Sequence, residues 1–142
     1  MSDATRTIER YFDALNAGDV AGAVGCVADD FFNEHTSALG QSLKGRDAYA
    51  QKLPTFLAQF QGLHYELEDV IEQDGRVAVP YTMSFRWTAP DGREHPVSIR
   101  GMFRFVVEDG LIAHRTDYWD SAEFVRQTQT QTQTQTQTQG QG

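Results

Sequence analysis

The sequence VAVPYTMSFRW, residues 77–87, decides the fold class. Its odd-numbered positions, from Val77 to Trp87, are all apolar or aromatic, whereas its even-numbered positions hold Ala, Pro, Thr, Ser and Arg. A period of two over this length predicts a long β-strand with one buried face. Pro80 has no backbone N–H, which predicts an edge position or a bulge at that point of the strand.

The same alternation continues on both sides of this strand. Three further segments are predicted strands because they alternate in the same way: residues 64–73, 97–108 and 111–120. Asp-Gly or Pro-Asp-Gly turns separate these segments, as in β-hairpins. The second half of the chain is therefore expected to form an antiparallel meander.

Before Gly62 the apolar period is about 3.6 residues, which predicts helices. The predicted elements are a helix over Asp3–Ala17, a short helix from a cap at Asp19 to about Val27, a short strand over 31–35, and a helix over 46–60 in which Pro54 introduces a kink or a break. Helices followed by strands indicate an α+β fold, with three helices on one face of a strongly curved sheet. Such a sheet encloses a conical cavity.

The composition divides the chain of 142 residues into two parts. Residues 127–142 contain only Gln, Thr and Gly, so they cannot bury apolar area and are expected to form a disordered tail. The hydrophobic fraction is 39% for the whole chain and rises to about 44% for residues 1–126. Residues 1–126 are therefore expected to form one ordinary globular domain.

Charge and residue content exclude several classes of function. A net charge of −8 argues against a nucleic-acid partner, because phosphate contacts require clustered Lys and Arg, and it disfavours anionic membrane surfaces. No apolar run approaches the roughly 20 residues of a membrane span, and the first residues lack the pattern of a secretion signal. Cys26 is the only cysteine, so no internal disulfide can form, and a cytoplasmic location is expected.

Three segments carry a family resemblance: RYFDALNAGDVAGAVGCVADDFFNEH (10–35), LKGRDAYA (43–50) and FRFVVEDGLIAHRTDYWD (103–120). In order and content they resemble the nuclear transport factor 2-like superfamily, over residues 5–126. Within it the chain most resembles the SnoaL-like polyketide cyclases, with limonene epoxide hydrolases and ketosteroid isomerases as more distant relatives. The resemblance implies a cone-shaped, cystatin-like fold and a homodimer formed through the outer sheet face. It also implies a cavity in which reactions are catalysed without a cofactor.

The resemblance places one acidic residue in a catalytic position. Asp117 stands where the cyclases keep an acid/base Asp and where the epoxide hydrolases keep one of two essential carboxylates. The other Arg and Asp of the epoxide hydrolases fall on Tyr81 and Met83, so that reaction lacks its full set of residues.

The catalytic set of the ketosteroid isomerases is also incomplete. Tyr11 matches their tyrosine on the first helix, and their general base falls on His35. Their protonated strand carboxylate falls on Gly101, which has no side chain. The resemblance therefore implies the fold more firmly than the reaction.

Asp117, His35 and Tyr81 are the candidate catalytic residues. An aromatic cavity would raise the pKa of Asp117 by desolvation, as suits a general acid or base; the alternative is a structural pair with Arg115 or His35. His35 is either a proton shuttle or a packed or surface residue. The Tyr81 or Tyr11 hydroxyl could donate a hydrogen bond to a developing oxyanion, and the core alternative for Tyr81 is equally good.

The remaining candidate residues indicate what kind of ligand the cavity binds. Five residues are expected to bind substrate: Tyr11, Met83, Phe85, Phe103 and Trp119. Their side chains are apolar or aromatic, which predicts a small apolar partner molecule. The sequence has no metal-ligand spacing, so neither a metal nor a cofactor is expected.

Two classes of function remain open. The first is an enzyme that performs cofactor-free acid/base chemistry, of the cyclase, isomerase or dehydratase type, on an apolar carbonyl, polyketide-like or terpenoid substrate. The second is a non-catalytic module of the same fold that binds a hydrophobic ligand or a partner protein. A module of this kind would lack some of the catalytic residues of the related enzymes, as this sequence does.

Overall fold

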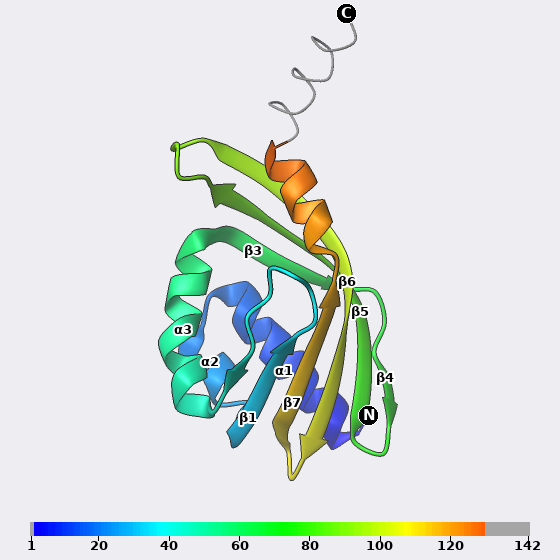
Figure 1. Cartoon of the computed structure of the whole chain (residues 1–142). Helices are drawn as coiled ribbons and strands as arrows, with labels where there is room; N and C mark the ends of the chain where they lie inside the picture. The colour runs from blue at the N-terminus through cyan, green and yellow to red at the C-terminus, as the bar shows by residue number, and fades with distance from the viewer. Residues whose placement is uncertain (1, 130–142) are drawn as a thin grey trace, which may run out of the picture.

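The computed structural model describes residues 2–129. Its elements are α1 (Asp3–Ala17), α2 (Val20–Val24), β1 (Val27–His35), β2 (Leu43–Lys44), α3 (Arg46–Gln59), β3 (Phe60–Leu67), β4 (Ile71–Gln73), β5 (Arg76–Thr88), β6 (Glu94–Glu108) and β7 (Leu111–Trp119). A further helix, which has no label, spans residues 121–129 (Figure 1). No helix in the described part of the chain is long and apolar enough to cross a bilayer.

The strands form one mixed sheet in the order β2-β1-β7-β6-β5-β3, and β4 also pairs with β5. β1 and β7 are parallel neighbours, whereas the other pairs are antiparallel. Figure 1 shows α1, α2 and α3 on one side of this sheet, which curves toward them. This arrangement confirms the predicted α+β cone with three helices on its concave face.

The first helix forms where the sequence predicts it. The Ser2 hydroxyl caps it by accepting a hydrogen bond from the Thr5 N–H at 3.1 Å, and Gly18 ends it in the left-handed conformation with φ 71°. Its apolar stripe, which includes Phe12 and Leu15, is buried against the sheet. Phe12 packs edge-on against Tyr65 and other aromatic rings, and this aromatic core supports the base of the cone.

Two predicted boundaries differ from the structure in the first half of the chain. The short helix α2 ends at Val24, and the following strand begins at Val27 rather than at Phe31. The third helix continues through Pro54 as one element, so the predicted break is absent.

The predicted strand over 64–73 is divided into β3 and β4. Pro80 lies opposite the end of β3, and its carbonyl accepts a hydrogen bond from the Glu68 N–H at 2.8 Å. On its other side Pro80 is in register with Met102 of β6. The strand that holds this proline is therefore not an edge strand, and the missing N–H falls where the neighbouring strand is interrupted.

The helix at 121–129 was not predicted, and it crosses the expected domain boundary at residue 126. The Asp120 carboxylate accepts a hydrogen bond from the Ala122 N–H at 3.0 Å, and Phe124 packs on Trp87 with ring centroids 5.1 Å apart. The Asp-Ser-Ala-Glu sequence at 120–123 has the pattern of a capping box and could have indicated this helix.

The side chain of Gln127 connects this helix to the sheet. Its amide accepts a hydrogen bond from the Ser98 N–H and donates one to the Ser98 carbonyl, both at 2.7 Å. Thr128 is also buried. The first residues of the expected tail are thus part of the domain, and residues 130–142 lie outside the described part of the chain.

Candidate functional site

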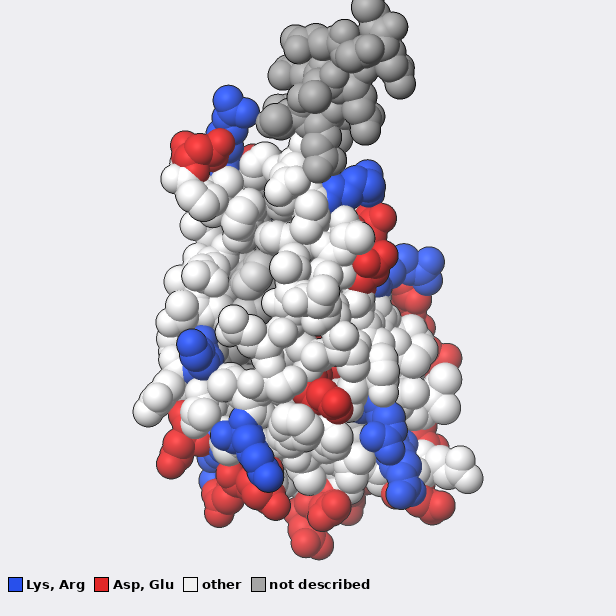
Figure 2. Space-filling view, viewed as in Figure 1, with Lys and Arg blue, Asp and Glu red and all other residues white. Residues whose placement is uncertain are grey.

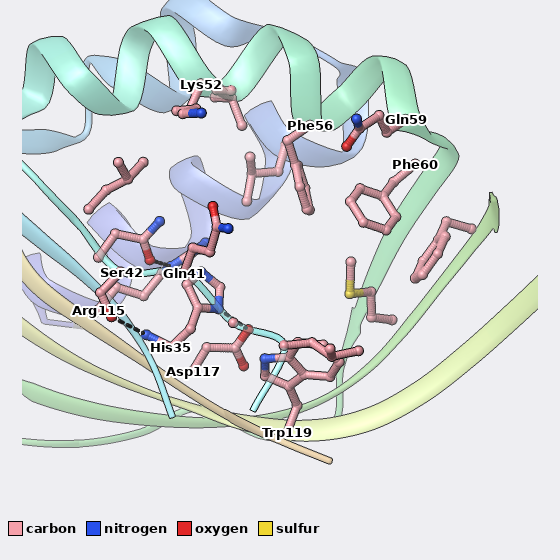
Figure 3. A pocket seen from close by; sticks show the side chains of 18 of the residues that line it. His35, Gln41, Ser42, Lys52, Phe56, Gln59, Phe60, Arg115, Asp117 and Trp119 are labelled. Atoms are coloured by element: carbon pink, nitrogen blue, oxygen red, sulfur yellow. Dashed lines mark hydrogen bonds and ion pairs between the residues drawn. The ribbon is translucent and has the colours of Figure 1, made fainter. Parts of the chain in front are cut away.

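A cavity of about 500 Å³ opens between α3 and the concave face of the sheet. The loop 36–42 and the helix 121–129 contribute to its wall. Figure 2 shows few charged side chains around the hollow in the middle of this face; most lie at the lower end and along the right edge of the view. In Figure 3, His35, Asp117 and Trp119 lie at one end of the cavity, and Phe56 and Phe60 lie at the other.

The parallel pairing of β1 with β7 brings the two main candidates together. His35 is in register with Asp117, and both side chains face the cavity. His35 Nδ1 lies 3.6 Å from Asp117 Oδ2, which is an ion-pair distance but too long for a hydrogen bond. Asp117 Oδ1 accepts a hydrogen bond from the Tyr81 hydroxyl at 2.6 Å. All three predicted catalytic residues therefore form one cluster.

Asp117 has an unusual acidity for a carboxyl group. Its side chain is only 8% exposed, and burial raises its pKa from 3.8 to about 6. The nearby Arg115 guanidinium and the hydrogen bond from Tyr81 oppose that rise in pKa. Asp117 consequently changes its protonation state close to neutral pH, as a general acid or base must.

The pKa of the His35 imidazole shifts in the opposite direction. Burial, followed by the positive charge of Arg115, lowers the pKa of His35 from 6.5 to about 4. The imidazole is therefore neutral near pH 7. Of the two neighbouring groups it is Asp117, and not the histidine, that titrates nearest to neutral pH.

The loop after β1 positions this pair. The Thr36 N–H and hydroxyl both donate hydrogen bonds to the Asp117 carbonyl, at 3.2 and 3.1 Å. The His35 N–H donates to the Ser42 hydroxyl at 3.2 Å. A side chain at Gly40 would collide with His35 Cβ, so the loop can pass this close only because that position is glycine.

The Tyr81 hydroxyl, which the sequence suggested as an oxyanion donor, is hydrogen-bonded to the Asp117 carboxylate in the structure. The tyrosine ring is buried against Phe103. Gly101 provides the space for this hydroxyl, because a methyl group there would lie 2.5 Å from Tyr81 Oη. The phenol thus occupies the space that a side chain at position 101 would need, where its hydroxyl donates to the Asp117 carboxylate.

A buried arginine beneath the cavity was not among the predicted site residues. Arg115 Nε donates to the Asn33 side-chain oxygen at 2.9 Å, and one terminal nitrogen donates to the Tyr11 hydroxyl at 2.8 Å. The hydroxyls of Tyr11 and Tyr49 are hydrogen-bonded at 2.6 Å. Arg115 precedes Asp117 by two residues and shares its strand face, which is the signal that could have identified it.

The structure places three of the five predicted substrate-binding residues in the cavity wall: Met83, Phe85 and Trp119. Tyr11 and Phe103 are instead fully buried and do not line the cavity. They are large side chains at the centre of the sheet and the first helix, where packing leaves no contact with the cavity. The apolar wall of the cavity also contains Phe56, Phe60 and Phe124, which the sequence did not predict there.

Two buried nitrogen atoms of the cavity have no hydrogen-bond partner among residues 2–129. They are His35 Nδ1 and Trp119 Nε1. Buried polar groups are nearly always hydrogen-bonded, so these atoms mark a place where a ligand could provide the missing partner. The same part of the chain contains no cluster of three His, Cys, Asp or Glu that could hold a metal.

Comparison with solved structures shows the same fold in several proteins. The chain is 27% identical to a polyketide cyclase candidate from Silicibacter sp., over 87% of this chain and 93% of that chain, with a TM-score of 0.73. It is 14% identical to a SnoaL-like polyketide cyclase candidate from Shewanella putrefaciens, over 90% and 97% of the two chains, with a TM-score of 0.80. It is 19% identical to TerC, crystallised with polyporic acid, over 89% and 98%, with a TM-score of 0.75.

A search of curated proteins gave no match. The family model of the SnoaL-like domain matches residues 8–115, from the first helix to the buried arginine on β7. The match ends two residues before Asp117 and so does not include that carboxylate. Because the match covers most of the chain, this protein belongs to the SnoaL-like domain family.

Proposed function

We propose that this protein is an enzyme that performs cofactor-free acid/base chemistry, of the cyclase, isomerase or dehydratase type, on a small apolar carbonyl compound. A polyketide-like or terpenoid substrate fits the apolar cavity. The observation that carries the proposal is the buried Asp117, whose pKa of about 6 makes it a base or an acid near neutral pH. Support also comes from the relatives, among them the polyketide cyclase candidate with 27% identity.

The reaction begins with the ionised carboxylate. Asp117 Oδ1 is engaged by Tyr81, which leaves Oδ2 to accept a proton from the carbon next to the substrate carbonyl. The C–H bond breaks, the proton moves to Asp117 Oδ2, and the electron pair moves into an enolate. Return of that proton to another carbon gives isomerisation. Attack of the enolate carbon on a second carbonyl closes a ring, and the alkoxide that forms from that carbonyl takes the proton back from Asp117.

Arg115 and His35 influence the proton transfer to Asp117. The positive charge of Arg115 lowers the pKa of Asp117 and so keeps part of the carboxyl ionised despite its burial. His35 is neutral near pH 7 and lies beside Asp117 Oδ2, where it can hydrogen-bond to the substrate or to the protonated acid.

Proton exchange tests the proposal without knowledge of the natural substrate. A panel of apolar ketones, including 2-acetylnaphthalene and cyclohexenone, is incubated with the protein in D₂O, and deuterium incorporation next to the carbonyl is measured by mass spectrometry. The wild type should accelerate exchange of at least one compound, and Asp117→Asn should lower that rate by about 100-fold or more, because a general base contributes 10²- to 10⁴-fold.

Asp120→Asn is the matched control. Asp120 is exposed and caps the last helix, a role that Asn also performs, so this variant should exchange at the wild-type rate. Equal exchange by wild type and Asp117→Asn would contradict the proposal. Tight binding of a ketone without any exchange would favour the alternative, a ligand-binding module, which the absence of the relatives' charged residues at Tyr81 and Met83 also suggests. The cytoplasmic location and the homodimer stay predictions.

A further inference from the structure

The indole of Trp119 is a hydrogen-bond donor that the protein leaves without an acceptor. Its Nε1 atom is buried and has no partner within residues 2–129. Trp119 lines the cavity and follows Asp117 by two residues, so both side chains project from the same face of β7. Figure 3 shows the nitrogen edge of the indole turned toward the Asp117 carboxylate.

Two neighbouring donor side chains, Tyr81 and Arg115, already make hydrogen bonds within the protein. The Tyr81 hydroxyl donates to Asp117, and the buried Arg115 donates to Asn33 and to Tyr11. His35 Nδ1 also lacks a partner, but an imidazole nitrogen carries a proton in only one of its neutral tautomers. The indole N–H, in contrast, is a donor at every pH and can accept nothing.

We propose that Trp119 Nε1–H binds the carbonyl oxygen of the substrate and stabilises the oxyanion when Asp117 removes the neighbouring proton. This inference rests on the proposed function and assigns the donor that it lacks. When the C–H bond breaks, the electron pair moves to the carbonyl oxygen, and a preorganised donor at that oxygen stabilises the charge that develops there.

The same geometry defines the class of substrate. The carbonyl end lies between Trp119 and Asp117, and the remainder of the molecule extends toward the aromatic wall at the far end of the cavity (Figure 3). There Phe60 packs against Phe56 in a tilted arrangement and edge-on against Phe85, with ring-centroid distances of 4.5 and 4.6 Å. Flat walls of this kind favour a flat, conjugated or aryl ketone over a branched aliphatic one.

A pair of probes of equal shape isolates this hydrogen bond. They are 2-acetylnaphthalene, a ketone, and 2-isopropenylnaphthalene, in which a CH₂ group replaces the oxygen atom. Equilibrium dialysis gives the Kd of each probe for the wild type and for Trp119→Phe, which keeps an aromatic ring but has no N–H. The ratio of ketone Kd to alkene Kd should rise about 3- to 10-fold in Trp119→Phe, as expected for one neutral hydrogen bond.

Trp87→Phe is the matched control, because Trp87 is the only other tryptophan and does not line the cavity. Its probe ratio should equal that of the wild type. The ¹⁵N NMR spectrum of the folded wild type gives a second readout that needs no variant at position 119. The ketone, but not the alkene, should move one indole N–H signal downfield, and that signal should be the one that persists in Trp87→Phe.

Two results would overturn the assignment of Trp119. One is an unchanged Kd ratio in Trp119→Phe, and the other is an indole signal that the ketone leaves in place. Failure of the proposed function is recognised separately, since it appears as equal deuterium exchange by wild type and Asp117→Asn and does not depend on either probe ratio.

Discussion

At the residue scale, burial acts in opposite directions on the two titratable groups that lie 3.6 Å apart. The pKa of Asp117 rises from 3.8 to about 6 and that of His35 falls from 6.5 to about 4, because both residues favour the neutral form in the cavity. In the folded protein both groups are therefore largely uncharged between about pH 4 and 6, whereas in the unfolded chain both are charged.

These pKa values predict how stability depends on pH. The raised pKa of Asp117 contributes stability that is present below pH 3.8 and is lost, by about 3 kcal/mol, as the pH rises to about 6. The lowered pKa of His35 contributes stability that is present above pH 6.5 and is lost, by a similar amount, as the pH falls to about 4. The two changes nearly cancel in the wild type between pH 4 and 6.

Single variants should separate the two contributions. Urea unfolding between pH 4 and 7.5 is compared with the wild type at each pH, so that the surface carboxylates cancel. Relative to the wild type, Asp117→Asn should lose stability as the pH falls from 6.5 to 4, whereas His35→Gln should gain stability over the same change. If the free energy of unfolding changed with pH in the same way for the wild type and both variants, the pKa values of Asp117 and His35 would not be shifted by burial as described.

The hydrogen bond from Tyr81 gives a second prediction at this scale. Tyr81→Phe removes a bond that lowers the pKa of Asp117, so the apparent pKa of the exchange reaction should increase, and unfolding should become easier by about 1 kcal/mol. Tyr118 is a suitable control for the pH profile, because its side chain is exposed and does not contact the carboxylate, and Tyr118→Phe should leave that profile unchanged. An unshifted pH profile in Tyr81→Phe would mean that the phenol does not hold the carboxylate.

At the element scale, the helix at 121–129 completes the cavity. Phe124 lines the cavity and packs on Trp87, and Gln127 makes two hydrogen bonds with the backbone of Ser98. After β7 ends at Trp119, this side chain takes the place of a neighbouring strand along β6. Residues 127–129 of the expected disordered tail are therefore helical in the structure, and their contribution to stability is a prediction.

Two truncations test this correction. Removal of everything after Arg126 deletes the Gln127 bonds and the buried Thr128, and should lower the free energy of unfolding by about 1–3 kcal/mol. Removal of everything after Gln129 keeps these contacts, and the Gln-Thr composition of what it deletes predicts no loss. Identical unfolding curves for the two truncated proteins would show that Gln127 and Thr128 contribute nothing.

The helices and strands illustrate what a sequence pattern can predict. The periodicity and the caps at Ser2 and Gly18 are local, so the first helix matches its prediction. The division of the strand before Asp74 depends on Pro80 of the neighbouring strand, and the last helix was not predicted, since its Asp120 cap follows directly after β7. The division of the strand depends on contacts between elements, which the hydrophobic period does not reveal, whereas the capping-box pattern at 120–123 is a local signal for the last helix.

At the scale of the whole molecule, the parallel pairing of β1 with β7 creates the site, and local patterns do not predict it. Asp117 and His35 are far apart in sequence, and only the family resemblance suggested that both face one cavity. The resemblance did not indicate the depth of burial, so Tyr11 and Phe103 were assigned to the wall although they are in the core. Burial reverses the ordinary order of these two pKa values, from 3.8 for Asp117 and 6.5 for His35 to about 6 and about 4.

The outer face of the sheet carries the predicted homodimer contact. Met102 and Tyr118 are neighbours in register there, and they are 41% and 48% exposed. Sedimentation velocity should show a dimer for the wild type and a monomer for Met102→Glu, because a buried unpaired carboxylate is costly. Leu39→Glu, at an exposed position on the loop beside the cavity, should leave the dimer intact. A monomeric wild type would contradict this prediction.

The pH dependence of ketone deuterium exchange between pH 4 and 8 shows directly whether Asp117 is the base. If Asp117 is the base, the rate should rise with pH, reach half of its maximum near pH 6, and level off above it, because only the carboxylate accepts the proton. The rise should be absent in Asp117→Asn and present in Asp120→Asn. A rate that is independent of pH, or a rise near pH 6 that persists in Asp117→Asn, would contradict the assignment of Asp117 as the base.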